Sequence, residues 1–125
     1  LRTGGQARVF TTEAVDRAFA ATLLASSGAD AFICANDKIA ADLVEHFTAL
    51  GVGVPADVLV AGVDDCGVAS TVDVGLTTAR QPCEALAEAA LELMLGRLRT
   101  RRMPARQVLL EAPVIIRGST LRPAA

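Results

Sequence analysis

The stretch AFICANDKIAADLVEHFTALGVGVPADVLVAGVDD, residues 31–65, contains the alternation that decides the fold. Residues 31–35 (AFICA) and 58–63 (VLVAGV) are continuous apolar runs with the length of buried strands. Between them lies a helix whose apolar residues recur at helical spacing. Either Asn36 or Asp37 is its N-cap, and the sequence does not decide between the two. Two buried strands joined by an amphipathic helix form a right-handed β-α-β unit. The sequence therefore predicts an α/β fold built on a parallel sheet.

The residues before this unit predict one further strand and one further helix. Residues 7–10 (ARVF) form a short β-like run, and Thr11 or Thr12 is placed to cap the helix that follows. Gly28 ends that helix, because glycine readily adopts the left-handed conformation of a helix C-terminus.

The residues after the unit predict a second strand–helix–strand succession. A helical turn around Val68 to Val72 precedes an extended segment at 76–80, LTTAR. Pro82 then stands at the first position of the longest helix, where proline fits best. The final run, residues 108–117, is strand-like, but Pro113 cannot donate to a ladder, which favours an edge strand or a break.

Composition excludes several classes of protein. The chain has 125 residues, 52% of them hydrophobic, with 12 Lys plus Arg against 14 Asp plus Glu. Such a chain buries enough apolar surface to fold, so it is not intrinsically disordered. It contains no apolar run long enough to cross a membrane, so no membrane partner is expected. A mildly acidic balance also makes a poor general binder of nucleic acid.

The cysteines and the histidine argue against metal sites and catalysis. Cys34, Cys66 and Cys83 form no C-x-x-C pair and His46 is the only histidine, which argues against a zinc site. An odd number of cysteines in apolar surroundings indicates reduced thiols and a cytoplasmic protein. No glycine-rich phosphate loop or nucleophile elbow is present, so the sequence predicts no enzyme, no catalytic residue, no metal and no cofactor.

Polar side chains follow two neighbouring strands at the point where each strand ends. Asn36-Asp37 follows the first strand and Asp64-Asp65 follows the second. Ligands of open parallel sheets bind beyond the carboxyl ends of the strands, and amide and carboxylate groups there suit a polyhydroxylated molecule. The same residues also serve as helix caps or turn residues, so both interpretations stay open. Gly62 is expected to let the backbone pass close to a neighbour.

Five motifs in order resemble the effector-binding region of LacI/GalR-type transcriptional repressors. The match spans residues 31–98, with a looser match from the first helix to the final strand. The motifs are Asn36-Asp37, Val54-Pro55-Ala56-Asp57, Gly62-Val63-Asp64-Asp65, Leu76-Thr77-Thr78 and Gln81-Pro82. Val63 departs from the family pattern, in which an aromatic residue is common at that position.

The resemblance implies a three-layer, periplasmic-binding-protein-like (type I) subdomain, present in part. It implies that Asn36, Asp64 and Gln81 contact a small effector, sugar-like or purine-like. The same resemblance places Ala41 and Val72 near the subunit contact of a homodimer. Along the chain it implies three parts: residues 1–81 belong to the C-terminal subdomain, 82–105 form a crossover helix belonging to the other subdomain, and 106–125 form the returning strand and tail.

The resemblance also implies what stands upstream. The chain begins at Leu1, and repressors of this kind carry an N-terminal helix-turn-helix and the first half of the effector-binding domain before this region. Operator DNA is therefore expected to be bound only through that N-terminal domain. A secreted solute-binding protein of an uptake system shares the fold and is the alternative. An upstream signal peptide would favour that alternative, and a helix-turn-helix would favour the regulator.

The leucine-rich stripe of the helix over 82–98 requires a cover. Burying each such side chain is worth about 1.5–3 kcal/mol. We expect the helix either to fold back on the rest of this chain or to pair with a second copy.

Overall fold

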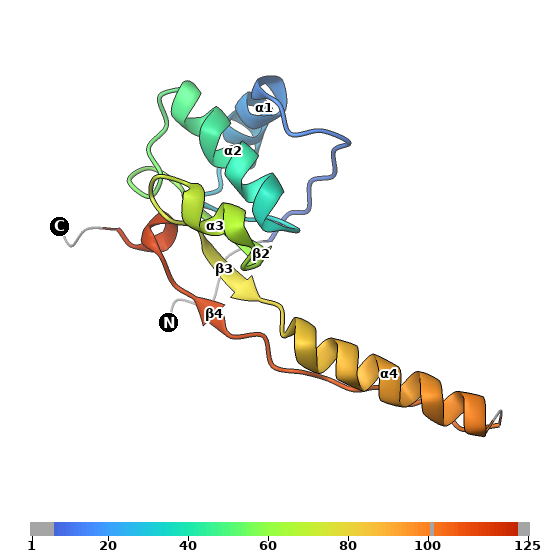
Figure 1. Cartoon of the computed structure of the whole chain (residues 1–125). Helices are drawn as coiled ribbons and strands as arrows, with labels where there is room; N and C mark the ends of the chain where they lie inside the picture. The colour runs from blue at the N-terminus through green and yellow to red at the C-terminus, as the bar shows by residue number, and fades with distance from the viewer. Residues whose placement is uncertain (1–6, 101, 123–125) are drawn as a thin grey trace.

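The computed structural model describes residues 7–100 and 102–122, and it contains one mixed sheet with helices packed against it (Figure 1). The strand order is β1-β2-β3-β4, with the first three strands parallel and β4 antiparallel to β3. The α/β prediction with a parallel sheet is confirmed. In chain order the elements are α1 (Arg17–Ser27), β1 (Ala31–Ile33), α2 (Asp37–Ala49), β2 (Leu59–Asp64), α3 (Gly67–Thr71), β3 (Thr77–Arg80), α4 (Cys83–Arg99), β4 (Val114–Ile115) and the 3-10 helix η1 (Gly118–Thr120).

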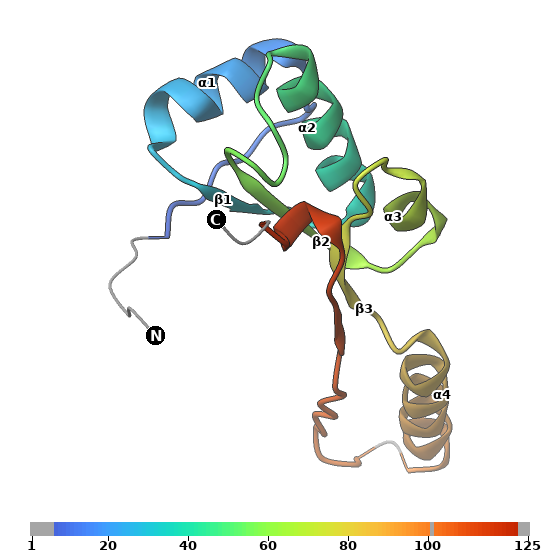
Figure 2. The same cartoon turned by 90° about the vertical axis from the view of Figure 1, so that its left-hand side faces the viewer.

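The hydrophobic core lies between the sheet and the pair α1 and α2, which run over one of its faces (Figure 2). Phe47 of α2 is completely buried, and its ring lies 5.2 Å from that of Phe32 on β1. Val60 of β2 and Leu76 before β3 are also fully buried. Apolar residues of α2 at helical spacing thus cover the central strands, as the sequence pattern predicts.

The prediction that 31–35 forms a buried strand is wrong for the alternate residues, because Ala31, Ile33 and Ala35 are exposed. Successive residues of a strand point to opposite faces of the sheet. Phe32 and Cys34 point toward the helices, and Cys34 is buried, whereas Ile33 is 85% exposed. Within the described residues, no helix covers Ile33 on its side of the sheet.

The first segment differs from its prediction. Residues 7–10 form no strand, and Val9 is almost fully exposed, because none of the described strands pairs with it. Helix α1 begins after Asp16 rather than after Thr11 or Thr12, since the Asp16 carboxylate accepts a hydrogen bond from the backbone N–H of Phe19 at 2.7 Å. Gly28 ends the helix in the left-handed conformation, with φ 60°, as predicted.

A second region, the arm, projects from this core. We define the arm as residues 81–100 and 102–112, which comprise α4 and the chain that returns beside it (Figures 1 and 2). No residue of α4 is buried. The expectation that 82–98 folds back to cover its leucines is therefore wrong: α4 contacts the returning segment near Met103 and Arg106, but its leucines stay largely exposed. Pairing with a second copy stays a prediction.

The returning strand is much shorter than the run at 108–117. Only Val114 and Ile115 pair with β3, at the edge of the sheet. The carbonyl of Pro113 accepts a hydrogen bond from the Arg80 backbone N–H at 2.9 Å, and proline has no N–H to offer in return. The prediction of an edge strand or a break at Pro113 is confirmed in both respects, because β4 lies at the edge of the sheet and begins only after Pro113.

Candidate functional site

The carboxyl ends of β1, β2 and β3 meet at one edge of the sheet. Ile33 pairs with Ala61, and Asp64 pairs with Arg80, so Asn36 follows β1 at the level where Asp64 ends β2. Gln81 comes directly after β3. We call Asn36, Asp64 and Gln81 the strand-end trio; the parallel register brings all three to the same edge.

Two members of the trio are in direct contact. The amide nitrogen of Gln81 donates a hydrogen bond to the Asp64 carboxylate, and its backbone N–H donates to the Asp64 carbonyl at 3.4 Å. Asp64 is half-buried, whereas Gln81 is exposed. This edge therefore presents a carboxylate and an amide side by side, with acceptors and donors close to solvent.

Asn36 has a structural role as well as its place at the edge. Its side-chain oxygen accepts a hydrogen bond from the Ile39 N–H at 2.8 Å, which makes Asn36, not Asp37, the N-cap of α2. Among the described residues, its amide nitrogen has no hydrogen-bond partner, so two donors remain for a ligand.

Asp37 is the buried carboxylate behind this edge. Its side chain is fully buried and accepts hydrogen bonds from the Thr78 hydroxyl at 2.6 Å and the Cys66 backbone N–H at 3.0 Å. A side chain at Gly62 would overlap the Asp37 carboxylate and lie 3.1 Å from its Cα. The expected close backbone approach at Gly62 is thus confirmed, and Asp37 joins α2, β3 and the loop after β2.

The backbone of the acidic pair adopts an uncommon conformation. Asp64 has φ 117° and Asp65 has φ 54°, and residues other than glycine rarely adopt a positive φ. The Asp65 N–H donates to the Thr78 hydroxyl at 3.2 Å, and the next N–H, of Cys66, is held by Asp37. Neighbouring side chains therefore hold this loop in place.

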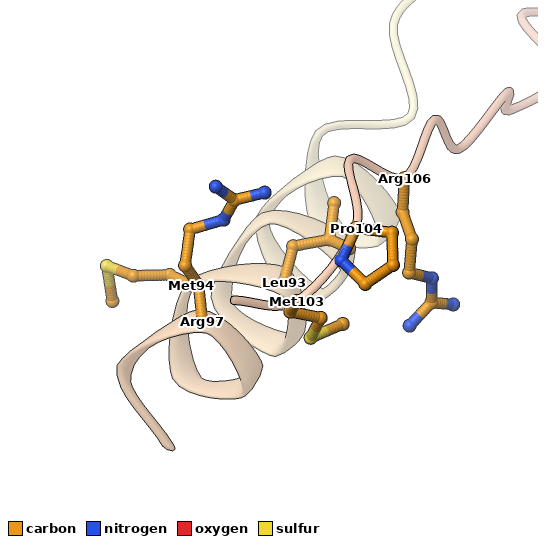
Figure 3. A pocket seen from close by; sticks show the side chains of 6 residues that line it. All are labelled: Leu93, Met94, Arg97, Met103, Pro104 and Arg106. Carbon is orange, nitrogen blue, oxygen red and sulfur yellow. The ribbon is translucent and has the colours of Figure 1, made fainter. Parts of the chain in front are cut away.

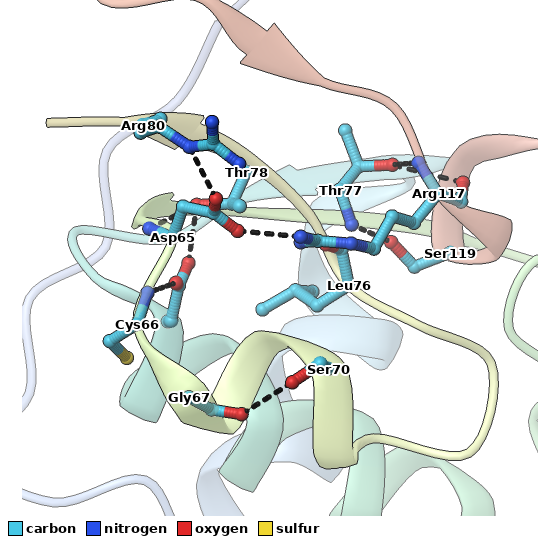
Figure 4. Close-up of polar contacts among 11 residues, drawn as sticks. Asp65, Cys66, Gly67, Ser70, Leu76, Thr77, Thr78, Arg80, Arg117 and Ser119 are labelled. Atoms are coloured by element: carbon cyan, nitrogen blue, oxygen red, sulfur yellow. Dashed lines mark hydrogen bonds and ion pairs between the residues drawn. The ribbon is translucent and has the colours of Figure 1, made fainter.

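Asp65 points toward two arginines (Figure 4). One carboxylate oxygen accepts from Arg117 and the other from Arg80, both at 2.6 Å, and the Asp65 side chain is only 7% exposed. Hydrogen bonds from Arg117, and then from Arg80, hold the pKa of Asp65 below its ordinary value. Asp64 and Asp65 thus have different partners, which argues against their acting together as an acid–base pair.

Sequence reasoning missed this cluster. Arg117 lies 52 residues from Asp65 and Arg80 lies 15 residues away, and no spacing rule connects them. The signal that was available is the polar character of the segments flanking the last two strands, since Arg80 ends β3 and Arg117 follows β4 closely.

The remaining predicted residues are placed as follows. Ala41 lies half-buried on α2 and Val72 lies half-buried after α3, and α2 and α3 pack together. Their place in a subunit contact stays a prediction. The imidazole of His46 lies 3.2 Å from the Val15 carbonyl, a structural contact between α2 and the segment before α1.

The described residues offer nothing for a metal ion, since no group of three His, Cys, Asp or Glu side chains is placed to hold one. Burial raises the pKa of the Cys34 thiol to about 11, so it is protonated and unreactive at neutral pH, while Cys66 and Cys83 are exposed. No described helix is both long enough and apolar enough to span a bilayer.

One pocket lies on the arm, away from the strand-end trio (Figure 3). It has a volume of about 230 Å³ and lies between α4 and the returning chain. Its lining is Leu93, Met94, Arg97, Met103, Pro104 and Arg106. The pocket is open to solvent and contains none of the residues predicted to bind a ligand.

Comparison with known proteins connects this architecture to a family. The model of the periplasmic binding protein-like domain matches residues 4–120. The transcriptional regulator MalR of Streptomyces coelicolor is 33% identical over 101 residues, 81% of this chain and 29% of its own length. The lactose operon repressor of Rhizobium radiobacter is 32% identical over 77% of this chain and 84% of its own length.

Solved structures give the same result. A complex of the transcriptional regulator CelR with cellobiose has a TM-score of 0.74 and 28% identity, over 82% of this chain and 32% of that one. A LacI family regulator of Enterococcus faecium with bound ribose has a TM-score of 0.69 and 26% identity, over 83% of this chain and 38% of that one. The chain spans about 29% of the length of the first curated relatives that it matches.

Proposed function

The chain belongs to the LacI family of transcriptional regulators, and on that premise we propose that its strand-end trio contacts a small polyhydroxylated effector. The chain corresponds to the effector-binding region of such regulators. The family membership expected from the sequence motifs is therefore confirmed, and MalR, the lactose operon repressor and CelR are regulators rather than transport components.

The observation that carries the proposal is the pairing of Asp64 with Gln81 at the edge where Asn36 also stands. A carboxylate accepts hydrogen bonds from sugar hydroxyls, and the amides of Asn36 and Gln81 donate to the hydroxyl oxygens. Charge-assisted hydrogen bonds of this kind are worth about 1.5–3 kcal/mol each. Two solved relatives bind cellobiose and ribose, which supports a sugar-like effector for this chain.

The proposed regulation follows from the two regions of the molecule. An effector that contacts the strand-end trio on one side and another subdomain on the other changes the angle between them, provided that it binds one arrangement more tightly. In this proposal residues 1–81 belong to the C-terminal subdomain, 82–105 form the crossover helix and 106–125 form the return. Binding then alters how a dimer, joined near Ala41 and Val72, presents an N-terminal helix-turn-helix to operator DNA.

A thermal-shift screen with cellobiose, lactose, ribose and purine bases tests the proposal. A ligand at 100 times its dissociation constant adds about 2.7 kcal/mol of stability. We expect at least one sugar to raise the Tm, and Asp64→Ala to abolish that shift. The matched control is Asp42→Ala, which removes an exposed carboxylate paired only with Lys38 on α2 and should leave the shift unchanged. A full shift retained in Asp64→Ala would place the ligand elsewhere.

A further inference from the structure

Two short segments connect the core to the arm. The outbound segment leaves β3 at Arg80 and enters α4 through Gln81 and Pro82. The inbound segment returns through β4, which ends at Ile115, and reaches η1 at Gly118. The outbound segment lies at the sheet edge where Asp64 ends β2, whereas the inbound segment runs back along β3, from Ile115 beside Thr78 to Arg117 beside Thr77. The direction of the arm relative to the core depends on how these two segments are held.

Asp65 binds both segments at once (Figure 4). One of its oxygens accepts from Arg80 on the outbound segment and the other from Arg117 on the inbound segment, each at 2.6 Å. Arg117 is fixed in turn, because it also donates to the Leu76 carbonyl at 2.8 Å. The Asp65 side chain is 7% exposed, so solvent screens these pairs less than it screens pairs on the open surface.

Asp65 is also the immediate neighbour of a proposed ligand contact. Asp64 and Asp65 both have positive φ, and the loop is held by Thr78 and Asp37. The peptide that they share therefore has little freedom to turn. A rotation of the arm that moves Arg80 or Arg117 acts on Asp65 and, through that peptide, on the position of the Asp64 carboxylate.

We propose that Asp65 is a positioning residue, which clamps the outbound and inbound segments together and couples the direction of the arm to the placement of Asp64. The coupling to a ligand rests on the proposed function, but the clamp itself does not require a ligand. Replacing Asp65 by Asn keeps the size of the side chain and removes its charge, so the arm gains orientational freedom.

Double electron–electron resonance, which measures the distance between two spin labels, tests the clamp. The labels are placed at Glu45 of α2 and Glu88 of α4, both exposed, after Cys66→Ser and Cys83→Ser remove the exposed thiols. We expect Asp65→Asn to at least double the width of the core–arm distance distribution. A reference pair within the core, Glu45 and Asp73, should keep its width, because the clamp acts only on the arm.

Four further variants make the result decisive. Asp42→Asn, which breaks the exposed pair with Lys38, should leave the core–arm width unchanged. Arg80→Gln and Arg117→Gln should each broaden it, and they provide the test if Asp65→Asn does not fold. Adding both arginine substitutions to Asp65→Asn should broaden it no further, since the clamp is already open.

An unchanged width in the foldable clamp variants, or further broadening in the triple variant, would overturn the proposal. Because the measurement needs no ligand, its failure is distinguishable from a failure of the sugar screen. A broadened arm with no sugar binding would support the clamp and contradict the proposed effector. Sugar binding with an unchanged core–arm width would support the proposed effector and contradict the clamp.

Discussion

The core and the arm both contain a helix rich in apolar residues, but these residues are buried in the core and exposed on the arm. In α2, Phe47 and Ala40 are completely buried, because the helix lies across β2. In α4, Leu91 is 52% exposed and Leu98 is 72% exposed, although the leucine content is higher. An amphipathic pattern therefore predicts that a helix requires an apolar surface, but it does not identify that surface or ensure that the surface lies within the chain.

The largest expected difference between the two regions concerns side-chain truncation. Phe47→Ala should lower the free energy of unfolding by about 3–5 kcal/mol, because it leaves a cavity in the core. Leu98→Ala should change it by less than about 0.5 kcal/mol, as is usual for exposed positions. Urea unfolding followed by circular dichroism measures both. Similar losses in the two variants would show that the arm is packed as tightly as the core.

Glycine substitution sharpens the comparison because the two regions should respond with opposite sign. Gly62→Ala forces a methyl group onto the Asp37 carboxylate and should destabilise the core by about 1–3 kcal/mol. Gly96→Ala meets only the flexible end of Met103 and should stabilise α4 by up to about 1 kcal/mol, through helix propensity. Thermal unfolding monitored at 222 nm distinguishes the signs; destabilisation by Gly96→Ala would contradict the open packing of the arm.

The sequence predicted most of the core, because its signals are local. Gly28 ends a helix and Asn36 caps the next one, and both roles depend on residues only a few positions away. Glycine at position 62 indicated a close approach, although its neighbour, Asp37 on α2, is known only from the fold. The family motifs added the expectation that Asn36, Asp64 and Gln81 act together.

The remainder depended on tertiary contacts that no local pattern encodes. Asp and Thr are both common N-cap residues, so the sequence did not show that Asp16, rather than Thr12, begins α1. The exposure of Ile33 and Leu98 depends on what lies beside the sheet and α4, rather than on their own apolar character. The clamp joins Asp65 to an arginine 52 residues away, a pairing that requires the fold to be known.

The smallest expected effect distinguishes an ion pair at the core edge from one on the arm. Because arginines lower the folded-state pKa of Asp65, the ionised carboxylate stabilises the fold above its unfolded pKa of roughly 4. This contribution is lost as pH falls through the lower, folded pKa. Asp65→Asn should therefore reduce the loss in the free energy of unfolding as pH falls. We call this acidic part of the stability–pH curve its acid limb.

Glu92 is the matched control on the arm. It lies 3.7 Å from Arg106 with its side chain 76% exposed, so Glu92→Gln should leave the acid limb as it is in the parent protein. Chemical denaturation between about pH 2 and 6 measures both variants. An acid limb that responds to Glu92→Gln but not to Asp65→Asn would contradict the assignment of the stronger ion pair to the core edge.

The central claim, that a small ligand binds at the strand ends rather than on the arm, is tested most directly by an amide NMR titration with cellobiose, lactose and ribose in turn. The account predicts saturable shifts of the Asn36, Asp64 and Gln81 amides that share one dissociation constant, with Leu93 and Met103 unchanged. Shifts confined to the arm pocket, or no saturable shift of the trio with any of the three sugars, would contradict it.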